Sequence, residues 1–145
     1  MNTVYIDEAI ERYVNERMTA GKERAKARFL SYAHLRYTGE EIAEFMRHTT
    51  KLSRYYIHLT KVLENPFLGR EMAYFASMLV VAIFSCWLLN DDNTMLAGVF
   101  VLSGTIVNGW SLLRLICEKW RETGVMIAIY EEIADLAEKE AISCG

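Results

Sequence analysis

The residues best suited to metal or acid–base chemistry are the three histidines, His34, His48 and His58. His48 lies four residues after Glu44, a spacing that places both side chains on one face of a helix. A pair of ligands is too few for a metal site, because zinc sites in proteins use three or four. The chain also contains no glycine-rich phosphate loop, no CxxC pair and no HExxH motif. We therefore expect no catalytic residue, no cofactor and no metal site.

A second candidate for chemistry is the segment Arg28-Phe-Leu-Ser-Tyr-Ala-His34. Its spacing resembles the R-x(4–6)-H motif of HEPN ribonucleases, and helical geometry can bring the two side chains onto neighbouring turns. That resemblance implies RNA cleavage, whereas the alternative is a solvated basic face of a helix. Arginine-rich helices match so short a pattern often, and no nucleophile–base pair accompanies it. We expect that the protein is not an enzyme.

Two long uncharged segments, Met72–Asn90 and Asn93–Leu113, occupy the middle of the chain, and only Asp91 and Asp92 separate them. The hydrocarbon core of a bilayer is about 30 Å thick and needs roughly 20 mostly apolar residues per helix. Core helices of soluble proteins, the alternative, carry charged residues along one face. The segments therefore predict a transmembrane hairpin with spans at about 68–90 and 93–117.

Basic residues flank both predicted spans, while the turn between them carries only acids and amides. By the positive-inside rule, both termini are then cytoplasmic, and the turn lies on the far side of the inner (plasma) membrane. The polar N-terminus has no signal-peptide pattern, so we expect the first span to act as its own insertion signal. The expected topology and interface anchors are Arg70, Trp87, Trp110, Arg114, Lys119, Trp120 and Arg121.

The predicted fold is all-α, an integral membrane hairpin whose flanking cytoplasmic helices form a small bundle. Residues 1–65 are expected to form a cytoplasmic helical hairpin, with helices at 5–37 and 38–63, and Gly21 bends or divides the first one. The helical spacing of apolar residues predicts one apolar face on each cytoplasmic helix, made of Ile6, Ala9, Ile10, Tyr13 and Val14, then of Ile42, Phe45, Met46, Leu52, Tyr56, Leu59 and Leu63, and last of Ile129, Ile133, Leu136 and Ala137. Asn65-Pro66 ends the second helix. Residues 66–121 form the transmembrane hairpin. Gly124 marks a break before an amphipathic helix and tail in residues 122–145.

The second span carries small and polar residues that allow close helix packing and hydrogen bonding in lipid. Two interpretations remain open for this face. It packs within the hairpin, against Ala73, Ala76, Ser77 and Ser85 of the first span, or it meets other copies of the chain and lines a pore. The residues of this predicted association or pore face are Gly98, Ser103, Gly104, Thr105, Asn108 and Gly109.

The stretch Lys22–Arg36 is mostly basic, with aromatic residues between the charges. It suits anionic lipid headgroups, a solvated face, or packing against the acidic face of the last helix. Nucleic acid is an unlikely partner because the net charge of the whole chain is −3. The three cysteines, Cys86, Cys117 and Cys144, are odd in number and widely spaced, so we expect no disulfide framework.

The segment Trp110-Ser-Leu-Leu-Arg114, running on to Glu118, resembles the corresponding segment of SLATT-type two-transmembrane bacterial effectors. The resemblance implies an oligomeric, pore-forming or membrane-perturbing effector. The alternative is a non-catalytic accessory subunit or adaptor that anchors or stabilises a larger membrane complex. The expected partners are the lipid bilayer and either copies of the chain or other membrane-protein subunits.

Overall fold

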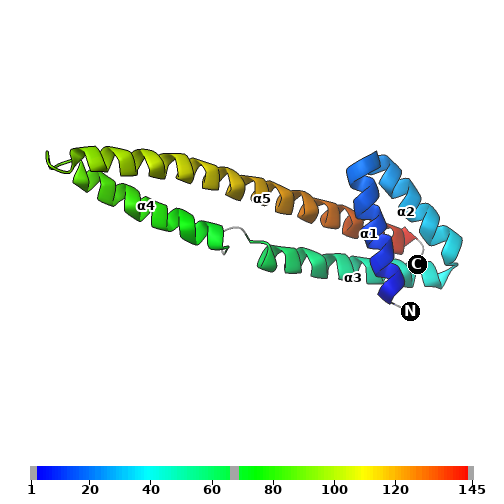
Figure 1. Ribbon diagram of the computed structural model, residues 1–145. Helices are drawn as coiled ribbons and strands as arrows, with labels where there is room; N and C mark the ends of the chain where they lie inside the picture. Colours follow the sequence, from blue (N-terminus) through cyan, green and yellow to red (C-terminus); the bar gives the residue numbers. More distant parts are fainter. Residues whose placement is uncertain (1–2, 66–68, 144–145) are drawn as a thin grey trace. The chain divides into compact units, whose positions relative to one another are not determined.

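The computed structural model describes residues 3–65 and 69–143, and every regular element in these residues is an α-helix. The prediction of an all-α fold is confirmed for this part of the chain. Its five helices are α1 (Thr3–Ala20), α2 (Lys22–Arg36), α3 (Glu40–Leu63), α4 (Arg70–Leu88) and α5 (Met95–Ser143), labelled in Figure 1.

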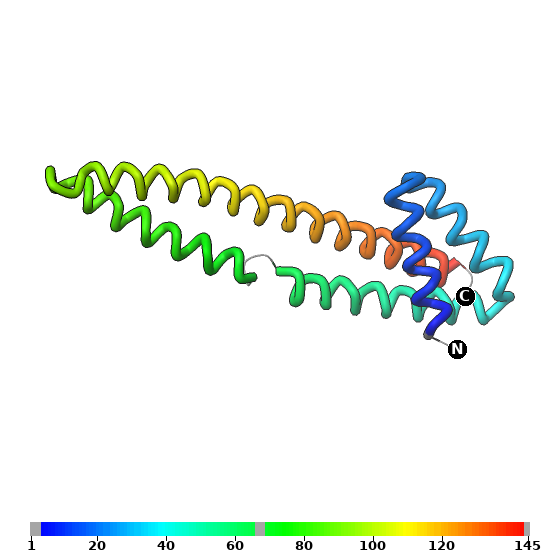
Figure 2. The backbone as a smooth tube through the Cα atoms, in the orientation of Figure 1, coloured from blue at the N-terminus to red at the C-terminus, as the bar shows by residue number. Residues whose placement is uncertain are grey.

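The chain divides into two compact units. The bundle unit contains α1, α2, α3 and the part of α5 that follows Thr123. The hairpin unit contains α4 and the part of α5 up to Thr123, which run side by side from the turn that joins them (Figure 2).

The bundle unit has a continuous hydrophobic core to which all four of its helices contribute. At its centre, the Phe45 side chain of α3 is fully buried and stacks on Tyr37, with ring centroids 4.8 Å apart. Phe29 of α2 lies 6.0 Å from the Phe45 ring and receives the edge of Tyr13 from α1 at 5.9 Å. The apolar faces predicted from helical spacing supply much of this core, whereas Leu63, predicted on the face of α3, is 72% exposed. The predicted residues found in the core are Ile6, Ala9, Ile10, Tyr13, Val14, Ile42, Phe45, Met46, Ile129, Ile133 and Ala137.

Glycine has opposite effects at two positions where a helix break was predicted. Gly21 divides residues 3–36 into α1 and α2 and has φ +88°, a conformation that L side chains rarely adopt. The predicted break at Gly124 is wrong, since α5 passes through this residue without interruption. A glycine in a helix interior costs only about 1 kcal/mol, which the hydrogen-bonded turns on either side outweigh.

The turn of the hairpin unit is built by short polar side chains, as Asn90–Asn93 predicted. The Asp91 carboxylate accepts a hydrogen bond from the Asn93 backbone N–H at 3.2 Å. The Thr94 hydroxyl donates to the Leu88 carbonyl at 2.9 Å and so connects the end of α4 to the start of α5. Both α4 and α5 are long and apolar enough to cross a membrane.

Three of the sequence-based expectations fall on residues that the structure does not describe. α3 ends at Leu63, but Pro66, the residue expected to end it, lies outside the described residues. The same holds for residue 68, the expected start of the first span, and for Cys144.

Candidate functional site

The six residues of the predicted association face lie on two different sides of α5. Gly98 is buried, and Thr105 and Gly109 are half-buried, on the side that packs against α4. Ser103, Gly104 and Asn108 are exposed. Successive residues of a helix are 100° apart, so positions 98, 105 and 109 share one face from which 104 and 108 point away. Packing within the hairpin therefore accounts for Gly98, Thr105 and Gly109 but not for Ser103, Gly104 and Asn108.

Gly98 is where α4 and α5 approach most closely near the turn. A Cβ atom at this position would lie 3.1 Å from the Leu89 backbone nitrogen and 3.2 Å from the Leu88 Cβ. Ser85 of α4 is fully buried, and its hydroxyl donates to the Val81 carbonyl at 2.8 Å. Of the residues expected on the facing surface of α4, Ser85 is buried, but Ala73, Ala76 and Ser77 are exposed.

Gly104 and Asn108 lie next to each other on the exposed side of α5, where the Asn108 amide is a polar group. A Cβ atom at Gly104 would meet nothing within 4 Å, so this position is open. The Asn108 amide N–H donates to the Gly104 carbonyl at 2.8 Å, a bond within the same helix. Asn108 forms no other hydrogen bond in the described part of the chain, so its carbonyl oxygen and second N–H stay available.

Ser111 belongs to the same exposed side and was not predicted. It follows Gly104 by seven residues and Asn108 by three, a spacing that places all three on one helix face. Its hydroxyl donates to the Val107 carbonyl at 3.2 Å. The spacing between Ser111 and these two residues in the sequence was sufficient to predict that Ser111 belongs to this face. We call Gly104, Asn108 and Ser111 the polar face of α5.

The remaining hydroxyls of the predicted face also bond within α5. Ser103 donates to the Val99 carbonyl and Thr105 to the Val101 carbonyl, both at 2.8 Å. Such bonds to the carbonyl four residues earlier satisfy a hydroxyl without any partner from another helix. Among the side chains of the predicted face, Asn108 is therefore the one with an N–H donor left over in the described part of the chain.

Most of the predicted anchors lie toward the two ends of the hairpin unit, whereas Trp110 lies near the middle of its α5 segment. Trp87, near the turn, and Trp110 are exposed, as is Trp120 toward the end of the unit. The Lys119 ammonium group contacts the Glu71 carboxylate at 2.8 Å and so ties α5 to the first turn of α4. Arg114 pairs with Glu118 at 3.0 Å along α5. Arg70 and Arg121 are exposed.

The surface of the hairpin unit is predominantly apolar. In each helix, only 6% of the most apolar 18-residue window is buried. Hydrophobic core helices of soluble proteins are mostly buried instead. The exposed large side chains include Leu79, Val80, Ile83, Phe84, Leu96, Phe100, Ile106 and Val107.

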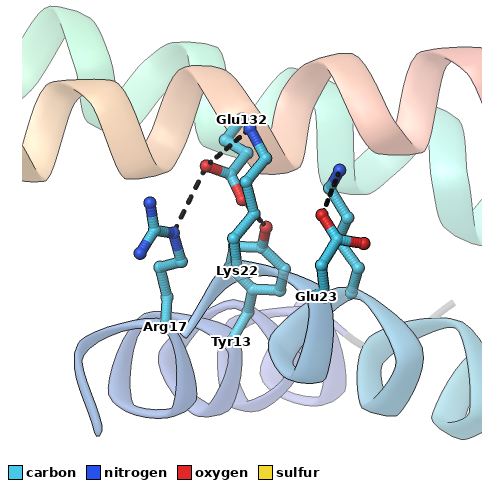
Figure 3. A network of polar contacts seen from close by, with 6 residues as sticks. Tyr13, Arg17, Lys22, Glu23 and Glu132 are labelled. Carbon is cyan, nitrogen blue, oxygen red and sulfur yellow. Dashed lines mark hydrogen bonds and ion pairs between the residues drawn. The ribbon is translucent and has the colours of Figure 1, made fainter. Parts of the chain in front are cut away.

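In the bundle unit, the main polar cluster surrounds Glu132 of α5 (Figure 3). The Tyr13 hydroxyl donates to Glu132 Oε1 at 2.6 Å. Arg17 Nε donates to Glu132 Oε2 at 3.3 Å, and the Lys22 ammonium lies 3.4 Å from the same oxygen. Burial by itself raises the pKa of the Glu132 carboxyl, but the hydrogen bonds from Tyr13, Arg17 and Lys22 outweigh it and lower the pKa below its ordinary value.

The Glu132 cluster shows that part of the basic stretch packs against α5. Lys22 pairs with Glu132, and His34 lies 3.2 Å from the Glu140 carboxylate, so two residues of the stretch face the acidic side of α5. The sequence had indicated this packing as one of three possibilities but not which carboxylate would be central. Only the packing of α1 and α2 against α5 singles out Glu132.

The residues considered for catalysis or metal binding are not assembled into one site. Arg28 pairs with Glu16, whereas His34 pairs with Glu140, so each has a different carboxylate partner. His48 lies 3.6 Å from Glu44, its neighbour on the same helix. Within residues 3–65 and 69–143, no three His, Cys, Asp or Glu side chains come together as a metal site would require. Cys86 and Cys117 are free thiols on the exposed surface.

Comparison with known proteins finds no relative: no protein-family model, no curated protein and no solved structure matches this chain.

Proposed function

We propose that the chain is a small integral membrane protein of the inner membrane that assembles with copies of itself through the hairpin unit and acts by perturbing or opening the membrane. The observation that carries the proposal is the exposed apolar surface of α4 and α5, since only 6% of each apolar window is buried. Apolar patches larger than a few hundred Å² rarely stay uncovered on a soluble monomer. Lipid covers such a surface at no cost in solvation.

The distribution of charge supports a topology with both termini in the cytoplasm. Arg70, Arg114, Lys119 and Arg121 lie at the open end of the hairpin, and Asp91 and Asp92 lie at its turn. The pairs Lys119–Glu71 and Arg114–Glu118 do not weaken this argument. Orientation follows the count of Lys and Arg near the spans, and acidic residues contribute little to it.

The polar face of α5 supports self-assembly. In lipid, the unpaired amide groups of Asn108 are costly unless another helix or water reaches them. Gly104, one turn away, leaves open space beside Asn108 into which a second helix fits. An assembly of several copies gives each Asn108 a partner and can enclose a path for water, which a single hairpin cannot.

Topology is tested by labelling single cysteines in a background in which Cys86, Cys117 and Cys144 are replaced by serine. Asp91→Cys lies in the turn, and Arg24→Cys lies on an exposed position of α2. A membrane-impermeant maleimide added to intact cells should label position 91 and not position 24. Labelling of both positions from the same side would contradict the hairpin.

Self-assembly is tested by Gly104→Leu and Asn108→Leu, with the particle mass in mild detergent as the readout. An interhelical hydrogen bond in a membrane contributes roughly 0.6–2 kcal/mol, so Asn108→Leu should reduce the assembled fraction. Val99→Leu is the matched control, because it enlarges an exposed side chain on the side of α5 away from the polar face. If all three variants keep the wild-type mass, the polar face does not hold copies together.

Gly98→Leu separates packing within the hairpin from packing between copies. The added side chain would collide with the Leu89 backbone, so the hairpin itself should lose about 1–3 kcal/mol of stability. Gly104→Leu should leave the stability of the hairpin unchanged and affect only the assembled fraction. Equal loss of hairpin stability in both variants would mean that Gly104 packs within one copy.

Membrane activity is tested by expressing the chain and following leakage of a potential-sensitive dye. Asn108→Leu should reduce leakage more than His34→Ala, because the former alters the span and the latter an exposed histidine of the bundle unit. The reverse ranking would favour an enzyme. A stable complex of fixed ratio with a different membrane protein, without leakage, would favour the accessory-subunit function.

A further inference from the structure

An exposed basic stripe runs along the side of α3 that borders α5. Its residues are Arg47, Lys51, Arg54, His58 and Lys61. The spacing of three and four residues keeps all five on one narrow face of the helix. The facing stretch of α5 carries Glu131, Asp135 and Glu138, again with a spacing of four and three.

The two charged stripes neutralise each other over only part of their length. Lys61 reaches Glu131 at 4.0 Å, and Arg54 reaches Glu138 at 2.8 Å. Arg47 and Lys51 form no ion pair in the described part of the chain. They lack a partner because the part of α5 beside them presents the apolar residues Ala141 and Ile142, which follow Glu138.

The two unpaired cations border a groove between α3 and α5. The groove has a volume of about 540 Å³. We call it the basic groove. It is lined by Arg47, Thr50, Lys51, Arg54, Glu138, Ala141 and Ile142. Since Arg54 and Glu138 compensate each other, the described residues leave two positive charges of the groove uncompensated, beside an apolar wall in which Ile142 is 77% exposed.

We infer that the basic groove binds the phosphate group of a ligand whose remaining part packs on Ala141 and Ile142. A guanidinium group donates two parallel hydrogen bonds to a phosphate, and an ammonium group adds a point charge. Arg47 and Lys51 are four residues apart on one helix face and border the same groove, so one phosphate can contact both. This site lies within the bundle unit and does not depend on the proposed membrane function.

The phosphate group can belong to a membrane phospholipid or to a free phosphorylated molecule. Two probes distinguish these sources, inorganic pyrophosphate and the short-chain lipid dihexanoyl phosphatidic acid below its micelle concentration. Each is titrated calorimetrically into the full chain in a neutral detergent. Binding of pyrophosphate alone assigns a free phosphorylated ligand. Binding of the lipid alone assigns a headgroup, with Ile142 beside its acyl chain.

The variant that tests the site is Arg47→Gln with Lys51→Gln. It should raise the dissociation constant of the bound probe about tenfold or more, because both charge-assisted contacts are lost. The matched control is Arg24→Gln with Lys139→Gln, which removes the same charge from exposed residues that form no ion pair in the described residues. The control should change the dissociation constant less than about threefold, as expected for distant screened charges.

Either of two results would overturn the inference: neither probe binds the wild-type chain, or the control variant weakens binding as much as the groove variant. Both double variants should keep the wild-type circular dichroism and melting temperature, because they alter exposed side chains. Should the double groove variant be unfolded, Lys51→Gln alone must still weaken binding more than Lys139→Gln alone.

Discussion

The bundle unit and the hairpin unit surround the same residue type, Phe45 in one and Phe100 in the other, in opposite ways. The Phe45 side chain is fully buried among aromatic rings of the bundle unit, whereas Phe100 of the hairpin unit is 71% exposed. The bundle unit encloses a core of apolar residues and carries charged stripes on its surface. The hairpin unit shows apolar residues outside and buries few of any kind. The two units therefore present surfaces of opposite character.

The largest expected effect compares these two phenylalanines directly. Phe45→Ala should reduce the free energy of unfolding by about 3–5 kcal/mol, because it leaves a cavity in a packed core. Phe100→Ala should change it by less than about 1 kcal/mol, since most of that side chain is exposed. Denaturant titration in mild detergent, followed by circular dichroism, measures both. Equal losses would mean that the hairpin unit has a core of its own.

The next comparison places a charge on an exposed apolar position in each unit. Val80 of α4 is 67% exposed, and Leu35 of α2 is 88% exposed. Arginine near the centre of a transmembrane helix costs about 2.5–3.5 kcal/mol on insertion scales, so Val80→Arg should reduce the membrane-inserted fraction. Leu35→Arg should leave it unchanged. A Val80→Arg chain that resists alkaline carbonate extraction as well as wild type would contradict the membrane assignment of α4.

A smaller effect distinguishes the ion pairs of the two units. Glu132→Gln should reduce the stability of the bundle unit by about 1–3 kcal/mol at neutral pH, because Arg17 and Lys22 lose their carboxylate partner in a partly buried site. Glu118→Gln, the control in the hairpin unit, removes an exposed partner of Arg114 and should cost less than about 0.5 kcal/mol.

The same glutamate predicts the response of the bundle unit to acid. Because its folded-state pKa is lowered from 4.5, the ionised carboxylate contributes stability that is present above pH 4.5 and is lost as the pH falls through the lowered value. The wild type should therefore lose stability between neutral pH and pH 3 more steeply than Glu132→Gln. Parallel acid profiles for the two chains would show that Glu132 is not held as a carboxylate.

The smallest expected effect concerns alkaline pH. The hydrogen bond from the Tyr56 hydroxyl to the Asp7 carboxylate, together with burial, raises the pKa of Tyr56 from 10.0 to about 12. The neutral phenol then contributes stability that is present below pH 10 and is lost as the pH rises through about 12. Tyr56→Phe should cost about 1 kcal/mol at neutral pH and flatten this alkaline loss. Tyr55→Phe, at an exposed position, should do neither.

The local pattern of residues was enough to place the helices and most of the bundle core. Ile6, Ile10 and Tyr13 are buried as their spacing indicated, and Gly21 divides its helix as expected. At Gly124, the same argument from glycine was wrong, because a break there depends on what the neighbouring turns contribute and not on the residue alone. The helix propensity of a single residue predicts a helix end only weakly, because the hydrogen bonds of the neighbouring turns can outweigh it.

What the sequence determined by itself is the kind of surface each unit presents. The absence of charge in two adjoining segments and the helical spacing of apolar residues elsewhere are properties of the chain that no packing can change. Only the tertiary structure decided which side of each helix meets another. It turned Gly98, Thr105 and Gly109 of α5 toward α4 and left Gly104 and Asn108 exposed. Among the described residues, it gave Arg47 and Lys51 no acidic partner. The physical reason is that a helix fixes the angle between its own residues, but the register between two helices follows from side chains that are distant in the sequence.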